Sequence, residues 1–175
     1  MSQQAATFFR RAAPHAIATT SGTGLFPSIA LAQAALESRF GQSILANRYN
    51  NLFGIKARPG DLYVTLPTWE VINGRNVTVR ERFAVYESFA DSFRQRLRFL
   101  KANPRYTKWG VFSARDYRAQ ARALQAAGYA TDPKYATKLI SLVQTYKLAA
   151  YDEQAKKKEK LSAFSSSSQP LALVS

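Results

Sequence analysis

The chain has 175 residues, of which 46% are hydrophobic, and its 25 basic and 11 acidic side chains give a formal net charge of +14. This length suits one packed domain, and the hydrophobic fraction excludes a disordered chain. The absence of cysteine excludes disulfides, thiolate nucleophiles and cysteine-ligated zinc. The positive field favours polyanionic partners, which include nucleic acid, anionic membranes and the acidic polymers of a bacterial wall.

The first segment predicts a helix from Ser2 to Ala13, an interruption or kink at Pro14, and a second helical piece to about Thr20. The lone His15 has no partner at metal-ligand spacing, so no metal site is predicted. The segment lacks a basic start followed by an uninterrupted apolar stretch, and no apolar run in the chain approaches bilayer-spanning length. We therefore expect no standard secretory signal and no stable membrane insertion.

A second helix is predicted from Pro27 to Phe40, because proline suits a first helical turn and apolar residues recur there at helical spacing. Its only acidic residue, Glu37, shares the apolar face with Gln33. A carboxylate on that face is partly desolvated, which raises its pKa and makes it a candidate general acid. The alternative is a surface glutamate at the rim of the helix, paired with Arg39.

The middle of the chain, from Leu62 to Tyr86, is rich in β-branched and aromatic residues. Asn73-Gly74 between such residues predicts a tight hairpin turn, which would place Glu70 opposite Val77. Glu70 is thus a candidate second acid on a small β-lobe, and Glu81 on the returning strand is its rival. The alternative for Glu70 is a solvent-facing strand residue beside the arginines of the returning strand.

The last third predicts further helices, the first capped by Ser88 and the others over about Ala114 to Ala127 and after Asp132-Pro133. The basic residues expected on the outer face of the first of these are Arg94, Arg96, Arg98 and Lys101. Beyond Asp152 the sequence becomes Lys-rich and then Ser-rich, which is typical of a solvated helix end and a flexible tail. We expect one catalytic domain over residues 1–150 and a basic, Ser-rich flexible tail over residues 151–175.

Two carboxylates, Glu37 and Glu70, therefore lie on elements that can face each other across a cleft, and aromatic residues accompany them in turns. Cleavage of a glycosidic bond requires this combination. One carboxylic acid protonates the leaving oxygen, and a second negative group supports the oxocarbenium-like centre. The aromatic side chains can stack on sugar rings, or they can belong to the core.

Four blocks of the sequence resemble the N-acetylglucosaminidase domain of glycoside hydrolase family 73, which includes flagellar muralytic domains, autolysins and phage lysins. The blocks are AQAALESRFGQS (32 to 43), NRYNNLFGIKA (47 to 57), FAVYESFADSFRQRLRFLKANPRY (83 to 106) and LQAAGYATDPKYATKLISLV (124 to 143). They occur in the family's order and cover about Ala5 to Tyr146. Four matches at consistent spacing are far more specific than a single motif.

The resemblance implies an α+β, mainly helical, lysozyme-like fold with a small β-hairpin lobe over the active-site cleft, and an activity that needs no metal or cofactor. The implied reaction cleaves the β-1,4 bond between N-acetylglucosamine and N-acetylmuramic acid in peptidoglycan. By position, Glu37 matches the family's general acid, Glu70 its second acid and Tyr129 its active-site tyrosine. The expected substrate-binding residues are Gln33, Asn51, Phe53 and Tyr135.

The expected partner is the glycan strand of peptidoglycan, bound by a monomer in the periplasm or cell wall, with no nucleic acid partner. Delivery is expected through lysis, phage release or a specialised secretion system, and an injected effector would have a cognate immunity protein. The alternatives are a muramidase or lytic transglycosylase on the same polymer, and a catalytically silent wall-binding module. The sequence leaves open a retaining, an inverting and a substrate-assisted mechanism.

Overall fold

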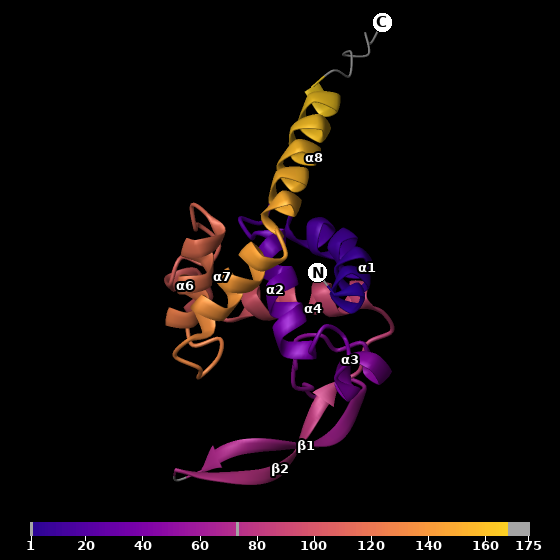
Figure 1. The fold of residues 1–175 in the computed structure, drawn as a ribbon, viewed down its shortest axis with the longest axis vertical. Helices are drawn as coiled ribbons and strands as arrows, with labels where there is room; N and C mark the ends of the chain where they lie inside the picture. Colours follow the sequence, from indigo (N-terminus) through magenta and orange to yellow (C-terminus); the bar gives the residue numbers. More distant parts are fainter. Residues whose placement is uncertain (1, 73, 168–175) are drawn as a thin grey trace, which may run out of the picture.

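The structure is a computed structural model that describes residues 2–72 and 74–167, apart from the side chains of residues 69–72, 76 and 165–167. Within that part the chain forms helices and one antiparallel hairpin. They are α1 (Gln3–Thr20), α2 (Pro27–Ser38), α3 (Ile44–Tyr49), β1 (Tyr63–Ile72), β2 (Arg75–Ala84), α4 (Phe89–Ala102), α5 (Pro104–Lys108), α6 (Tyr117–Ala126), α7 (Tyr135–Thr145) and α8 (Ala149–Ser167). Figure 1 shows the hairpin at one end of the helical body and α8 leaving the other. The predicted mainly helical α+β architecture is confirmed.

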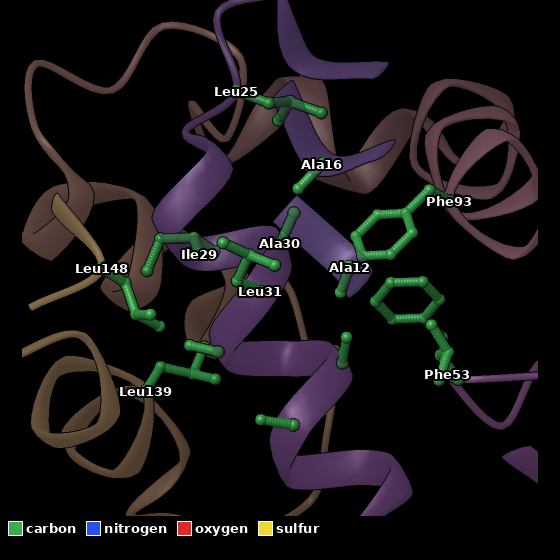
Figure 2. Packing of buried hydrophobic residues seen from close by; sticks show 14 of the residues in the cluster. Ala12, Ala16, Leu25, Ile29, Ala30, Leu31, Phe53, Phe93, Leu139 and Leu148 are labelled. Atoms are coloured by element: carbon green, nitrogen blue, oxygen red, sulfur yellow. The ribbon is translucent and has the colours of Figure 1, made fainter. Parts of the chain in front are cut away.

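Helix α2 runs through the centre of this body, where α1, α6, α7 and α8 pack around it. Its residues 27–35 are all buried, and most of them are alanine or larger aliphatic residues. Short alanine side chains let the neighbouring helices approach closely, and a helix that is apolar on all sides must be buried. Figure 2 shows Ile29 beside Leu139 and Leu148, while the rings of Phe53 and Phe93 lie on the other side of α2. Its one charged residue, Glu37, occupies the last turn.

Helix α1 is continuous, so the predicted interruption at Pro14 is wrong, while the alternative of a kink there stays a prediction. Pro14 lacks a backbone N–H and cannot pair with the carbonyl of Arg10. Pro14 and Arg10 are both exposed, so water can hydrate this carbonyl. The opposite face of α1 is buried against the core, and that packing keeps the helix in one piece.

The end of α2 differs from the prediction, because the helix stops at Ser38 instead of Phe40. Arg39 and Phe40 both adopt left-handed backbone conformations, with φ angles of 52° and 56°. Such conformations are strained for residues with a Cβ atom. The ring of Phe40 packs 5.9 Å from that of Phe9 and 5.4 Å from that of Tyr146, and this aromatic cluster offsets the strain. The sharp turn therefore begins two residues after Glu37.

The hairpin has the predicted register, with Ile72 opposite Arg75 and Glu70 opposite Val77. A two-stranded hairpin is marginally stable alone, and the loop that follows α3 supports its base. The amide of Asn51 donates hydrogen bonds to the carbonyls of Ile55 and Ala84, each at 2.9 Å, and its oxygen accepts one from the N–H of Ile55. The hairpin is therefore fixed at its base and projects from the body (Figure 1).

Helix α4 carries a charged residue on its buried face. The buried side chains recur at helical spacing, and they are Phe89, Ser92, Phe93, Arg96 and Leu100. Arg96 lies one turn after Phe93 and one before Leu100, so the prediction that it belongs to a basic outer face is wrong. Ser88 caps the helix as predicted, by accepting a hydrogen bond from the N–H of Asp91.

Helix α8 begins in the packed body and then leaves it. Asp152 is buried, and its carboxylate accepts hydrogen bonds from the N–H and the hydroxyl of Ser28 at 2.8 and 2.7 Å. The helix continues to Ser167, through most of the segment predicted as a flexible tail, and residues 168–175 lie outside the described part. The division into a domain of residues 1–150 and a tail of 151–175 stays a prediction, and the packing of Asp152 attaches the start of that segment to the body.

The entry into α2 gives a prediction about stability. Gly24 has a φ angle of +76°, and a Cβ atom placed there would lie 1.9 Å from the carbonyl oxygen of Phe112. We expect Gly24→Ala to lower the free energy of unfolding by about 2–5 kcal/mol, from backbone strain and overpacking together. Gly22→Ala is the matched control, because Gly22 has a φ angle of +67° but no atom within 4 Å of the added Cβ. Urea unfolding of both variants checks the difference, and equal losses would contradict the clash.

Candidate active site

Glu37 lies in the last turn of α2, and its residue surface stays open to solvent. Tyr135, at the start of α7, donates a hydrogen bond from its hydroxyl to Oε1 of Glu37 at 2.9 Å. Burial by the surrounding protein raises the pKa of the Glu37 carboxyl, and the hydrogen bond from Tyr135 lowers it by a smaller amount. The net direction is upward. Glu37 therefore combines solvent access with a stabilised protonated form, which is what a general acid needs.

Tyr135 is almost completely buried, so the start of α7 must be held firmly. The N–H of Tyr135 donates to the carbonyl of Asp132 at 3.0 Å, and the next N–H, that of Ala136, donates to the side chain of Gln125 on α6. Burial raises the pKa of the Tyr135 hydroxyl, and the negative charge of ionised Glu37 raises it further. The hydroxyl is therefore neutral and retains its proton for the bond to Glu37.

Two further buried residues continue the hydrogen-bond chain behind Tyr135. Nε2 of Gln33 donates to the Tyr135 hydroxyl oxygen at 2.9 Å, and Oε1 of Gln33 accepts from Nε and Nη2 of Arg96 at 3.0 and 2.5 Å. Gln33 has no exposed surface, and Arg96 is only 2% exposed. We call the chain formed by Arg96, Gln33, Tyr135 and Glu37 the relay. Sequence reasoning missed Arg96, although its helical spacing placed it on the buried face of α4.

Tyr129 joins the relay to a pocket of about 510 Å³. Its ring stacks on that of Tyr135 with centroids 5.6 Å apart and an interplanar angle of 18°, and it meets Phe99 edge-on at 6.1 Å. Burial raises the pKa of Tyr129, so this hydroxyl is also neutral. The aromatic residues that line the pocket are Phe53, Phe99 and Tyr129, and its polar residues include Lys56, Arg58 and Asn103. Aromatic walls with a few polar groups are typical of a sugar-sized ligand site.

The predicted substrate-binding residues thus divide into two groups. Phe53 lines the pocket, although only 5% of its surface is exposed, and Tyr135 reaches Glu37. Gln33 and Asn51 are buried, with their amides bonded inside the protein. The geometry does not support substrate contact by these two, because their polar atoms already have protein partners: Gln33 orients Tyr135, and Asn51 anchors the hairpin.

The candidate second acids lie on the hairpin. Alternation along the paired strands assigns position 70 to the same face as Glu81, which stands opposite Leu66. Glu81 is bound to Lys56, with Oε2 to Nζ at 3.2 Å. The side chain of Glu70 lies outside the described part of the structure, so its distance from Glu37 is not defined.

No three His, Asp or Glu side chains gather into a possible metal site among the described residues. His15 lies on α1 with its ring 6.4 Å from that of Phe93. In the same part of the chain, no helix is both long and apolar enough to cross a bilayer.

The sequence from 13 to 148 matches the glucosaminidase family model, described as mannosyl-glycoprotein endo-beta-N-acetylglucosaminidase. The chain belongs to this family. The match covers most of the chain and confirms the resemblance to glycoside hydrolase family 73. The catalytic domain of the autolysin Auto from Listeria monocytogenes has the same fold, with a TM-score of 0.78 and 33% identity over 87% of this chain and 89% of that one. The lysozyme-like architecture expected from the family is thus confirmed.

Two curated relatives are named after different activities. The chain is 42% identical over 135 residues to the exo-glucosaminidase LytG of Bacillus subtilis (strain 168), which covers 74% of this chain and 47% of LytG. It is 38% identical over 151 residues to a probable N-acetylmuramidase of Lactococcus lactis subsp. lactis (strain IL1403), covering 83% of this chain and 34% of the relative. The chain spans less than half the length of either.

Proposed function

We propose that the chain is a peptidoglycan hydrolase that cleaves the β-1,4 bond between N-acetylglucosamine and N-acetylmuramic acid, as an endo-β-N-acetylglucosaminidase. The observation that carries the proposal is the state of Glu37: an exposed residue whose carboxyl has a raised pKa and is bonded to Tyr135, in a member of the glucosaminidase family. The relative named as a probable N-acetylmuramidase supports peptidoglycan as the polymer, because N-acetylmuramic acid is a sugar of that polymer.

Glu37 acts as the general acid. Its protonated carboxyl gives the proton to the glycosidic oxygen while the C1–O bond breaks, and the bonding electron pair leaves with that oxygen. The hydrogen bond from Tyr135 strengthens as Glu37 becomes a carboxylate, because bonds to a charged acceptor are stronger than neutral ones. Tyr129 forms the wall of the adjoining pocket, where a neighbouring sugar ring can stack.

Glu70 supplies the second negative group. The positive charge that develops at C1 needs a nucleophile, a base that activates water, or the acetamido oxygen of the substrate itself. The register places Glu70 on the hairpin, which projects from the end of the body that contains the loop after α3. Water finally adds to C1, so that the net reaction is hydrolysis.

The charge of the chain suits this substrate. A net charge of +14 concentrates the protein on a wall that carries carboxylates and phosphates, and salt weakens this attraction. We propose action in the periplasm or cell wall as a lysin or an injected effector. An immunity protein is the partner expected in the second case.

The muramidase reaction is the second candidate, and the name of the Lactococcus lactis relative favours it. A muramidase uses the same acid chemistry on the alternate β-1,4 bond of the polymer. The two bonds alternate along the glycan strand. If the bound strand were displaced by one sugar along the groove, Glu37 would therefore act on the other bond.

The test is digestion of purified peptidoglycan, followed by borohydride reduction and mass spectrometry of the products. We expect reduced N-acetylglucosamine ends from the wild type and none from the control variant Glu37→Gln. Reduced muramic ends would establish the muramidase instead, and anhydromuramic ends a transglycosylase. No product from the wild type would contradict the enzyme and favour a wall-binding module.

A further inference from the structure

The relay ends at a buried cation that the proposed reaction does not itself require. Arg96 is 2% exposed and forms no ion pair with a carboxylate among the described residues. Its guanidinium lies 5.7 Å from the centroid of Phe53, and its polar contacts are the two bonds to Oε1 of Gln33. Burial lowers the pKa of Arg96, yet arginine stays charged in proteins. A buried charge of this kind is costly, which suggests a function for it.

The direction of the relay follows from what each group can donate. Arginine has no acceptor, so the atom of Gln33 that faces Arg96 must be the carbonyl oxygen. The amide nitrogen of Gln33 then faces Tyr135 and can only donate, so the Tyr135 oxygen accepts. The hydroxyl hydrogen of Tyr135 is therefore directed to Oε1 of Glu37.

We propose that Arg96 is a positioning residue that fixes the direction of every bond in the relay and thereby confines the acid proton of Glu37 to its Oε2 atom. Oε1 accepts from Tyr135 in both protonation states, so the proton lies on the other oxygen. The O–H bond at Oε2 breaks when the glycosidic oxygen takes the proton, and the charge that remains on the carboxylate is met at Oε1 by the Tyr135 hydroxyl. This role rests on the proposed function of Glu37.

Charged and titratable groups lie on each of the elements that carry or adjoin the relay. Tyr135 on α7 bonds Glu37 directly, and the ring of Tyr129, from the loop before α7, stacks on that of Tyr135. The guanidinium of Arg96 acts through Gln33 from α4. Arg39, just after the end of α2, is exposed, and the buried carboxyl of Asp152 on α8 bonds the opposite end of α2. On the hairpin, the carboxylate of Glu81 is paired with Lys56.

Two variants test the direction of the relay. Arg96→Met removes the donor that holds Gln33, so the amide can turn and accept the Tyr135 hydrogen. Gln33→Glu keeps the shape and the bonds to Arg96, but a carboxylate cannot donate to Tyr135 and takes its hydrogen instead. In both variants Glu37 loses a hydrogen bond that favours its ionised form, so its pKa rises.

The measurements are the pH dependence of kcat on peptidoglycan and a carbon-13 NMR titration of the Glu37 carboxyl. We expect kcat to fall about 10- to 100-fold in both variants, as for a misplaced catalytic group. The alkaline limb of the pH profile and the NMR pKa should both move to higher pH. Arg96→Lys, which retains a charged donor, should keep the wild-type limb and recover part of kcat.

Arg98→Met is the matched control, because Arg98 lies on the exposed side of the same helix. Arg98→Met should leave kcat, the alkaline limb of the pH profile and the NMR pKa of Glu37 unchanged. A wild-type limb and a wild-type Glu37 pKa in both relay variants would overturn the proposal, as would an equal shift in Arg98→Met. The NMR titration needs no substrate, so it still decides the relay if the wild type fails to digest peptidoglycan.

Discussion

Glu37→Gln is expected to reduce peptidoglycan hydrolysis by about 10²- to 10⁴-fold, the range that a positioned general acid contributes. Glutamine keeps the shape of the side chain, and its oxygen can still accept the bond from Tyr135. The variant therefore loses the proton donor and little else. In the wild type, activity should fall as the pH rises through the raised pKa of Glu37, since the acid must be protonated to act.

The same variant should be no less stable than the wild type. The folded-state pKa of Glu37 is raised, so between its unfolded value of about 4.3 and its folded value the native state binds more protons than the unfolded state. Stability is then lost as the pH rises through this window, because ionised Glu37 is less favourable in the folded protein. Glu37→Gln removes that penalty at neutral pH. The gain is small, because Glu37 is open to solvent.

Release of soluble muropeptides and thermal melts at pH 3.5 and pH 7 measure the two effects. The expected result is an inactive variant whose melting temperature at pH 7 equals or slightly exceeds that of the wild type, with the advantage gone at pH 3.5. Retained activity would remove Glu37 from the acid role. Inactivity with a large loss of stability would mean that the substitution had damaged the fold.

Local sequence signals predicted the elements that carry the site, because those signals are short-range. Asn73-Gly74 between β-formers specified the hairpin register, the helix expected to end at about Ala127 ends at Ala126, and the apolar spacing around Glu37 indicated the central helix. In each case the residue types within one or two turns of the chain decide the backbone. Tertiary packing left them unchanged.

The failures have the opposite cause. The continuity of α1 past Pro14 and the left-handed turn at Phe40 both depend on aromatic and aliphatic partners that are distant in sequence. Arg96 was assigned to solvent by its charge, although its position on α4 is on the apolar side. Its acceptor, Gln33, lies on another helix, and nothing in the local sequence of either residue reveals the pair.

The choice between Glu70 and Glu81 gives the other large expected effect. We expect Glu70→Gln to reduce peptidoglycan hydrolysis by about 10²-fold or more, because the developing charge at C1 loses its negative partner. Glu81→Gln breaks a partly exposed ion pair with Lys56, whose side chain is 55% exposed. It should change stability by less than about 1 kcal/mol and leave activity within a few-fold of the wild type.

The two variants share one face of the hairpin, so each is the other's control for a general disturbance of the lobe. Initial rates of muropeptide release should single out Glu70. A large loss in Glu81→Gln alone would transfer the second role to Glu81. If neither substitution slows the reaction, both carboxylates are excluded, and the acetamido oxygen of the substrate must support C1. De-N-acetylated peptidoglycan lacks that oxygen, so the wild-type enzyme should then fail to cleave it. If Glu70 or Glu81 supported C1 instead, the wild-type enzyme would still cleave this substrate.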